Sequence, residues 1–182
     1  MSGKSMIRLD HIYKKFYGKK EEVLAVRDVN MEIEKGEIFG IIGFSGAGKS
    51  TLVRCINLLE HPTEGAVYFG DTNLMMAGSG ELRKIRQRMG MIFQQFNLLE
   101  QRNVIENICY PLKIRRIRPD EQKIDQWLSR CGLTEKKHQY ARSLSSGEQQ
   151  KVSMIRALIF DPELVMIDDT LSNQDPENLE LF

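Results

Sequence analysis

Hydrophobic and polar residues alternate along the first third of the chain, as they do in β-strands with one buried face. Residues 7–11 and 29–33 show this spacing most clearly, and each range is expected to form a strand. The intervening residues 13–22 are polar and contain a glycine, so a turn or loop is expected there. Residues 37–42 are mostly apolar, which predicts a short strand buried on both faces, as in a parallel sheet.

Helical spacing of apolar residues begins at Lys49 and continues to Leu59. Further along, the pattern predicts a strand over 66–69, a charged helix over 81–88, a strand over 90–93, mainly helical structure over 102–142, a helix over 146–160 and a strand over 163–167. Breaks in the helical stretch are expected at Pro111, Pro119 and Gly132. Strands that alternate with helices, with a helical insert in the middle, predict an α/β protein.

Composition narrows the class of protein. Of 182 residues, 41% are hydrophobic and 28% are charged, which is typical of a globular domain. The 26 basic and 25 acidic residues give a net charge of +1, so charge offers no case for nucleic acid as a partner. No run approaches the roughly 20 apolar residues that cross a bilayer, and the N-terminus lacks the apolar core of a secretion signal. We therefore expect a cytosolic protein whose cysteines are reduced and which meets a membrane only through a partner.

One motif carries specific chemistry. Residues 43–51 fit the pattern G-x-x-x-x-G-K-[ST] of a phosphate-binding loop, between an expected strand and an expected helix. The glycines let the backbone curl so that successive N–H groups face phosphate oxygens, next to the positive end of the helix. Lys49 is expected to reach the β- and γ-phosphates, and Ser50 to bind Mg²⁺. The predicted phosphate-binding residues are Gly43, Phe44, Ser45, Gly46, Ala47, Gly48, Lys49, Ser50 and Thr51.

An acidic residue completes this pattern near the end of the chain. The apolar residues 164–167 predict a strand that delivers Asp168 at its C-terminal end, where α/β proteins bind their ligands. A phosphate-binding loop of this type needs such a carboxylate to hold Mg²⁺ through water. Asp168 is therefore predicted to belong to the magnesium site.

At this point the sequence resembles the ATP-binding subunit of ABC transporters, over essentially the whole chain. Residues 93–96 look like the Q-loop, which implies that Gln94 contacts Mg²⁺ and the attacking water and senses a transmembrane partner. Residues 144–150 stand where the signature motif would be, at a helix N-terminus that caps the γ-phosphate held by a second subunit. The implied signature residues are Leu144, Ser145, Ser146, Gly147 and Glu148. Ser172 and Asp175 occupy D-loop positions, and Phe16, with Tyr17 as the alternative, stands where an aromatic ring stacks on adenine.

The resemblance implies a P-loop ATPase fold: a mixed or parallel sheet core, an N-terminal antiparallel β subdomain and a helical subdomain. Residues 1–94 and 151–182 would form the ATP-binding core, and residues 95–150 the helical subdomain that carries the signature. Residues 41–65 and 89–99 look like amino-acid importers, and most like the ATPases of methionine importers. Such a protein uses ATP and Mg²⁺. It pairs with a second ATPase subunit at the cytoplasmic face of the membrane, on permease subunits that an external substrate-binding lipoprotein supplies.

Four departures from the family pattern predict impaired turnover. Asp169 stands where a glutamate polarises the attacking water, and it is one methylene shorter. Ser146 replaces a glycine at the signature, and Glu148 replaces the usual glutamine and would repel a γ-phosphate. The D-loop carries Asn173 and Gln174 in place of small and apolar residues. The chain also stops at Phe182, so the family's later strands, switch histidine and regulatory domain are expected to be missing.

Three functions fit these residues unequally. One is a working importer ATPase, and another is a degenerate module that binds MgATP with little or no hydrolysis. A different P-loop class, such as a DNA-repair ATPase or a kinase, fits poorly because the Q-loop and signature positions are filled. We expect weak ATP binding and hydrolysis far slower than in a complete relative, carried by Lys49, Ser50, Gln94, Asp168 and Asp169.

Overall fold

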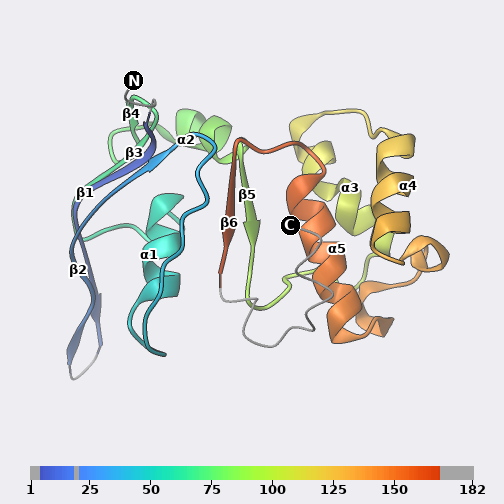
Figure 1. The fold of residues 1–182 in the computed structure, drawn as a ribbon, viewed down its shortest axis with the longest axis horizontal. Coiled ribbons are helices and arrows are strands. Elements are labelled where there is room, and N and C mark those ends of the chain that lie inside the picture. The colour runs from blue at the N-terminus through green and yellow to red at the C-terminus, as the bar shows by residue number, and fades with distance from the viewer. Residues whose placement is uncertain (1–4, 19–20, 169–182) are drawn as a thin grey trace. The chain divides into compact units, whose positions relative to one another are not determined.

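The computed structural model describes residues 5–18 and 21–168. The chain divides into two compact units, Met1–Arg86 and Gln87–Phe182 (Figure 1). The first unit carries the glycine-rich loop, and the second carries Gln94, the signature position and Asp168.

The first unit is built on an antiparallel sheet of four strands in the order β2-β1-β3-β4. Its strands are β1 (Ser5–Tyr17), β2 (Glu22–Glu34), β3 (Glu64–Phe69) and β4 (Thr72–Asn73), and its helices are α1 (Lys49–Ile56) and α2 (Ser79–Arg86). Figure 1 shows α1 beside the long β1–β2 hairpin. One face of the sheet is closed by Ile7, Leu9, Ile12 and Val67, which are at most 2% exposed.

The loop expected over residues 13–22 is wrong for most of its length, because Tyr13–Tyr17 continue β1 and Glu22 begins β2. The hairpin is held there by its backbone ladder, which pairs Lys15 with Leu24 and Phe16 with Val23. A salt bridge of 2.9 Å between Lys15 and Glu22 also crosses the two strands. Backbone pairing needs no apolar side chains, so the hydrophobic pattern did not reveal it.

The buried strand expected over residues 37–42 is also wrong. In the described part of the chain, these residues form no strand and belong to neither sheet. Ile38 is 100% exposed and Ile42 is 97% exposed. An apolar run becomes a strand only where a neighbouring backbone satisfies its N–H and C=O groups. The segment instead leads as extended chain from β2 into the glycine-rich loop.

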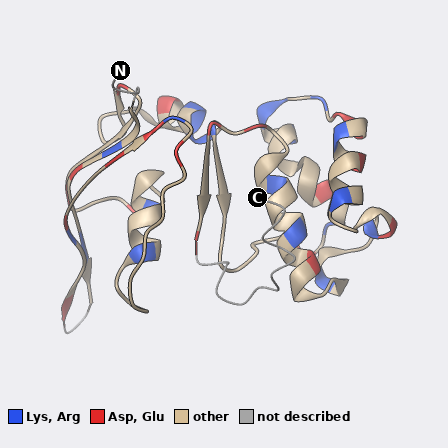
Figure 2. Ribbon diagram, in the orientation of Figure 1, with Lys and Arg blue, Asp and Glu red and all other residues tan. Residues whose placement is uncertain are grey.

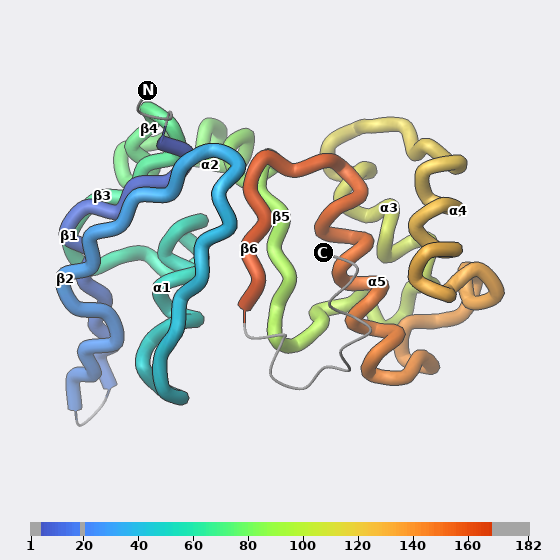
Figure 3. Tube along the Cα trace, in the orientation of Figure 1, coloured from blue at the N-terminus to red at the C-terminus, as the bar shows by residue number. Residues whose placement is uncertain are grey.

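The second unit contains a parallel strand pair and a group of helices. The strands are β5 (Met89–Ile92) and β6 (Leu164–Ile167), paired from Met89↔Leu164 to Ile92↔Ile167. The helices are α3 (Val104–Arg115), α4 (Glu121–Arg130) and α5 (Ser146–Leu158), with short 3-10 turns η1 (Thr134–Lys136) and η2 (Ala141–Ser143). The trace in Figure 3 shows β5 and β6 side by side, with α5 as the helix next to β5.

The three helices share one apolar core. Its buried members are Val104, Ile108, Leu112, Ile124, Leu128, Cys131, Leu133, Leu144, Val152, Ile155 and Ile159. Pro111 lies inside α3, so the break expected there is wrong. The buried neighbours Ile108 and Leu112 keep the helix packed despite the missing N–H. Breaks at Pro119 and Gly132 are confirmed, because α4 lies between these residues.

Charged residues of both signs alternate along the helices, as Figure 2 shows for α4. Two residues of α4 make ion pairs, Lys123 with Asp161 at 2.5 Å and Asp125 with Lys137 at 2.6 Å. Arg115, the last residue of α3, is half-buried, and its guanidinium carbon lies 3.5 Å from the centre of the Phe160 ring. The predicted α/β class, with an antiparallel N-terminal sheet, parallel strands and a helical part, is confirmed.

Candidate functional site

The glycine-rich loop curls tightly between the extended segment and α1. The Ala47 N–H donates to the Phe44 carbonyl at 3.1 Å, which closes a turn inside the loop. Gly46 and Gly48 have φ angles of +77° and +86°, in the left-handed region that favours glycine. The loop is largely exposed, and its tip residue Phe44 is 91% exposed.

Gly48 allows the loop to approach the sheet closely. A Cβ atom at this position would lie 2.1 Å from the carbonyl oxygen of Ala25 on β2. Because that oxygen belongs to the backbone, it cannot rotate away as a side chain would. Glycine at this position therefore lets the start of α1 lie against β2.

The N-terminus of α1 is open for an anion. Gly48 is its N-cap and supplies no side-chain hydrogen bond, and the first turn holds no acidic residue. The first N–H groups of a helix have no partner within the helix, and the helix dipole adds positive potential there. Ser50 and Thr51 lie in this turn, both half-buried.

Lys49 adds a charge to the same place. Its Nζ donates to the carbonyl oxygens of Gly43 and Phe44, each at 2.9 Å. The ammonium group is thus held over the beginning of the loop, although Lys49 itself lies at the start of the helix that follows the loop. A cleft of about 300 Å³ adjoins the loop on the side of β2, lined in part by Ala25, Ala47 and Gly48. Loop, helix end and lysine together fit a phosphate chain.

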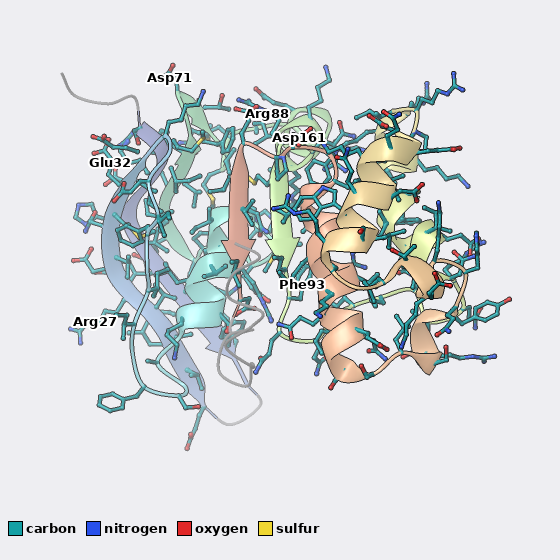
Figure 4. The ribbon with its side chains drawn as sticks, turned by 45° about the vertical axis from the view of Figure 1, so that its right-hand side comes forward. Arg27, Glu32, Asp71, Arg88, Phe93 and Asp161 are labelled. Carbon is teal, nitrogen blue, oxygen red and sulfur yellow. The ribbon has the colours of Figure 1, made fainter. Side chains whose placement is uncertain are left out.

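In the second unit, parallel pairing brings Gln94 and Asp168 to one sheet edge. Ile92 and Ile167 are paired residues at the ends of β5 and β6, and the Asp168 N–H donates to the Ile92 carbonyl at 2.9 Å. Asp168 is 2% exposed, whereas Gln94 is exposed. Figure 4 labels Phe93, the residue that follows β5, and Arg88, which precedes it. Arg88 forms a two-pronged ion pair with Glu163, at 2.6 and 2.7 Å, that joins the other ends of the strands.

The signature residues begin α5 with a capping box. The Ser145 Oγ accepts from the Glu148 N–H at 3.3 Å, and the Glu148 carboxylate accepts from the Ser145 N–H at 2.9 Å. Lys136 forms an ion pair with the same carboxylate. The hydrogen bond from Lys136, followed by that from Ser145, lowers the pKa of Glu148 below its ordinary value. Leu144 is buried, Ser146 is exposed and Gly147 is half-buried.

The sequence interpretation did not include Lys136. This residue is 12 positions from Glu148 and lies in η1, so no helical spacing joins the two. Two further residues were missed, Asn107 and Arg156, because their hydrogen bonds also depend on the folded chain. Both hold the segment that follows Gln94.

The remaining predicted site residues lie apart from these groups or outside the described structure. Phe16 is on β1, 39% exposed, with the Lys14 Nζ 4.8 Å from its ring centre, and Tyr17 is 74% exposed. Asp169, Ser172 and Asp175 lie outside the described residues.

The described residues contain no cluster of three or more His, Cys, Asp or Glu that could hold a metal ion. Mg²⁺ in nucleotide sites is held by one or two protein oxygens together with phosphates and waters. The Ser50 hydroxyl of the first unit and the Asp168 carboxylate of the second are each an oxygen ligand of this kind. Within the described residues, no helix is long and apolar enough to cross a membrane.

Comparisons with known proteins agree with this geometry. The chain is 45% identical over 174 residues to methionine import ATP-binding protein MetN 1 of Bacillus thuringiensis subsp. konkukian, covering 94% of this chain and 51% of that protein. It is 46% identical over 177 residues to MetN 1 of Listeria monocytogenes, covering 96% and 52%. The chain thus spans about half the length of these relatives.

Solved structures and a family model extend the comparison. A dimeric, post-hydrolysis state of an ATP-binding cassette bound to ADP and phosphate superposes with a TM-score of 0.87, at 32% identity, over 96% of this chain and 78% of that one. The ABC transporter family model matches residues 26–172, which include the glycine-rich loop, Gln94, the signature position and Asp168. By its sequence and its fold, the chain belongs to the ABC transporter family.

Proposed function

We propose that this chain binds MgATP as the nucleotide-binding part of an importer ATPase. The observation that carries the proposal is the beginning of α1: an uncapped helix N-terminus, a glycine loop that lies close against β2, and Lys49 held over that loop. An anion is stabilised at this point by backbone N–H groups, the helix dipole and a lysine ammonium together.

Each predicted residue has a distinct role in this proposal. The backbone of the glycine-rich loop binds the phosphate oxygens, and Lys49 neutralises the β- and γ-phosphates. Ser50, Gln94 and Asp168 supply oxygen ligands or water contacts for Mg²⁺, which neutralises phosphate charge when bound. Asp169 orients the attacking water, and Phe16 stacks on adenine. Water attacks the γ-phosphorus and ADP leaves.

The transported substrate and the partners follow from relatives rather than from residues of this chain. The relatives are named as methionine import proteins, and the similar cassette is dimeric. We therefore propose a homodimer that serves permease subunits at the cytoplasmic face of a membrane, with methionine as the substrate. The signature residues Leu144–Glu148 of one copy face the γ-phosphate of the other, and Ser172 and Asp175 lie at the same interface.

Turnover is expected to be slow, and two residues carry that expectation. Asp169 is one methylene shorter than glutamate, and a reacting group displaced by about 1 Å can cost a hundredfold in rate. Ser146 adds a side chain where the backbone must approach phosphate closely. Glu148 is a weaker obstacle than its charge alone suggests, because Lys136 pairs with it.

The test is nucleotide binding and hydrolysis by the purified chain, with a fluorescent ATP analogue and a phosphate-release assay. Lys49→Ala should abolish binding, and Lys35→Ala, an exposed lysine in a turn, should leave it unchanged. Asp169→Glu should raise hydrolysis without tightening binding. A wild-type rate typical of complete importer ATPases would contradict the expectation of slow turnover. Binding that survives Lys49→Ala would contradict the assigned site.

The second candidate, a nucleotide-binding module without useful turnover, is favoured by Asp169 and Ser146 specifically. The same assays separate it from the first. A module of this kind binds MgATP with no measurable phosphate release, and Asp169→Glu alone does not restore release because Ser146 still hinders close phosphate contact.

A further inference from the structure

A half-buried arginine of the signature helix holds the chain just after Gln94. Arg156 lies near the C-terminal end of α5. One terminal nitrogen donates to the Asn97 carbonyl at 2.6 Å, and the other donates to the Phe96 carbonyl at 2.8 Å. Burial lowers the pKa of Arg156. A guanidinium taken out of water needs such acceptors, and its planar fork fits two neighbouring carbonyls.

The segment held by Arg156 is short. β5 ends at Ile92, and the first carbonyl that Arg156 holds is that of Phe96. Gln94 therefore lies within a span of a few residues that is fixed at both sides. Asn97 has a φ angle of +48°, which turns the chain sharply at the clamped position. The end of β5 therefore fixes one side of the span, and Arg156 fixes the other.

Asn107 fixes the chain further on. It is 0% exposed, its Oδ1 accepts from the Leu99 N–H at 2.8 Å, and its Nδ2 donates to the Leu99 and Arg102 carbonyls at 3.1 and 3.3 Å. The chain beyond residue 98 is thus held by α3, and Phe96 and Asn97 are held by α5. The link closest to Gln94 is the one to the signature helix.

We propose that Arg156 is a positioning residue for Gln94, and that it couples the Q-loop to the helix whose first turn carries the signature. This inference rests on the proposed function, in which Gln94 serves the magnesium site. When α5 moves, the carbonyls of Phe96 and Asn97 move with it, and the short span that contains Gln94 follows. Lysine at position 156 would keep the charge but could not donate to both carbonyls in the same geometry.

The chain offers a matched control in Arg115. It is also half-buried in this unit and donates to two carbonyls, those of Gln87 at 3.0 Å and Pro111 at 3.1 Å. Its partners are Gln87, Pro111 and Phe160, and none of these belongs to the Q-loop. Arg115→Lys should therefore disturb helix packing about as much as Arg156→Lys does, without releasing the segment after Gln94.

The first experiment needs no nucleotide. Chymotrypsin cleaves after Phe96 only when the Phe96 carbonyl is free to enter the protease, and Arg156 holds that carbonyl. Under native conditions, Arg156→Lys should speed cleavage after Phe96 by roughly tenfold, relative to cleavage after the exposed Phe44 in the same digest. Arg115→Lys should leave this ratio unchanged. Equal ratios in Arg156→Lys and wild type would overturn the proposal.

The second experiment measures the dissociation constants for metal-free ATP and for MgATP, and takes their ratio. Loss of folded protein weakens the binding of metal-free ATP and of MgATP equally, whereas a displaced Gln94 weakens only the binding of MgATP. Arg156→Lys and Gln94→Ala should each lower the ratio, by roughly three- to tenfold. The double variant should lower the ratio no further than the stronger of the two single variants does. Arg115→Lys should leave the ratio unchanged.

An unchanged ratio in Arg156→Lys, multiplying effects in the double variant, or an equal loss in Arg115→Lys would each overturn the positioning role. If wild type binds neither form of ATP, the proposed function fails, and the proteolysis result alone then decides whether Arg156 holds the segment.

Discussion

The two left-handed glycines of the phosphate-binding loop give a sharp test of how that loop is fastened. Gly46 and Gly48 have similar φ angles, +77° and +86°. Their surroundings differ. A Cβ atom at Gly46 would have no heavy atom within 4 Å, whereas at Gly48 it would lie 2.1 Å from the Ala25 oxygen and 3.2 Å from its carbonyl carbon. Alanine at the two positions therefore separates backbone conformation from steric conflict.

The expected magnitudes follow from these two terms. A left-handed conformation costs a non-glycine residue about 1–2 kcal/mol, and both variants carry this cost. At Gly48 the backbone of β2 must also move, and overpacking of this kind adds about 1–3 kcal/mol. The register shift between Lys14↔Val26 and Lys15↔Leu24 shows Ala25 at a β-bulge, so the strand is bent where it meets Gly48. Moving it disturbs the ladder on either side.

Urea unfolding followed by circular dichroism measures the difference. With a slope of about 1–3 kcal/mol per molar urea, the additional cost should lower the midpoint of Gly48→Ala by roughly 1 M below that of Gly46→Ala. Equal midpoints would show that β2 moves away from the added Cβ atom without a loss of stability. A lower midpoint for Gly46→Ala would refute the reasoning outright.

Three further predictions concern the second unit and the thiols. Because its pKa is lowered on folding, the carboxylate of Glu148 stabilises the protein above its ordinary pKa of 4.5 and loses this effect as the pH falls through the lowered value. The stability difference between wild type and Glu148→Gln should therefore shrink in acid, and Lys136→Met should reduce it at neutral pH. Asn107→Ala should cost about 1–3 kcal/mol in urea unfolding, since it strips buried backbone groups of their partners. Burial raises the pKa of the Cys55 thiol to about 11, so a thiol reagent should label Cys55 only after unfolding, as mass spectrometry would show.

Local constraints explain what the sequence could predict. A left-handed turn favours glycine, and phosphate binding at a helix start calls for a lysine and a hydroxyl residue in fixed order. The loop from Gly43 to Thr51 could therefore be predicted without knowledge of the fold. Asp168 could be predicted for a similar reason, because an apolar run of strand length ends at an acidic residue. The helices of the second unit were also predicted, since their apolar faces repeat at helical spacing.

The predictions that failed concern residues whose structure depends on contacts between distant parts of the chain. Residues 37–42 are apolar enough for a strand, but they lie without a ladder in the described structure. Tyr13–Tyr17 are polar enough for a loop, yet backbone pairing with β2 makes them strand. Arg156 reaches the Asn97 carbonyl across 59 positions, a separation that no periodic pattern encodes.

Glu148 shows why a departure from a motif has to be judged with its partners. Taken alone, a carboxylate beside a bound phosphate is repulsive, and the sequence predicts a defect. In the fold, this carboxylate accepts the Ser145 N–H, pairs with Lys136 and completes the cap of α5, so its charge is already compensated before any phosphate approaches. Ser146 is exposed in the first turn of the same helix, and none of the contacts found there shields its side chain from an approaching ligand. In the proposed dimer, we therefore expect the serine, which adds bulk, to hinder phosphate contact more than the glutamate, which adds charge.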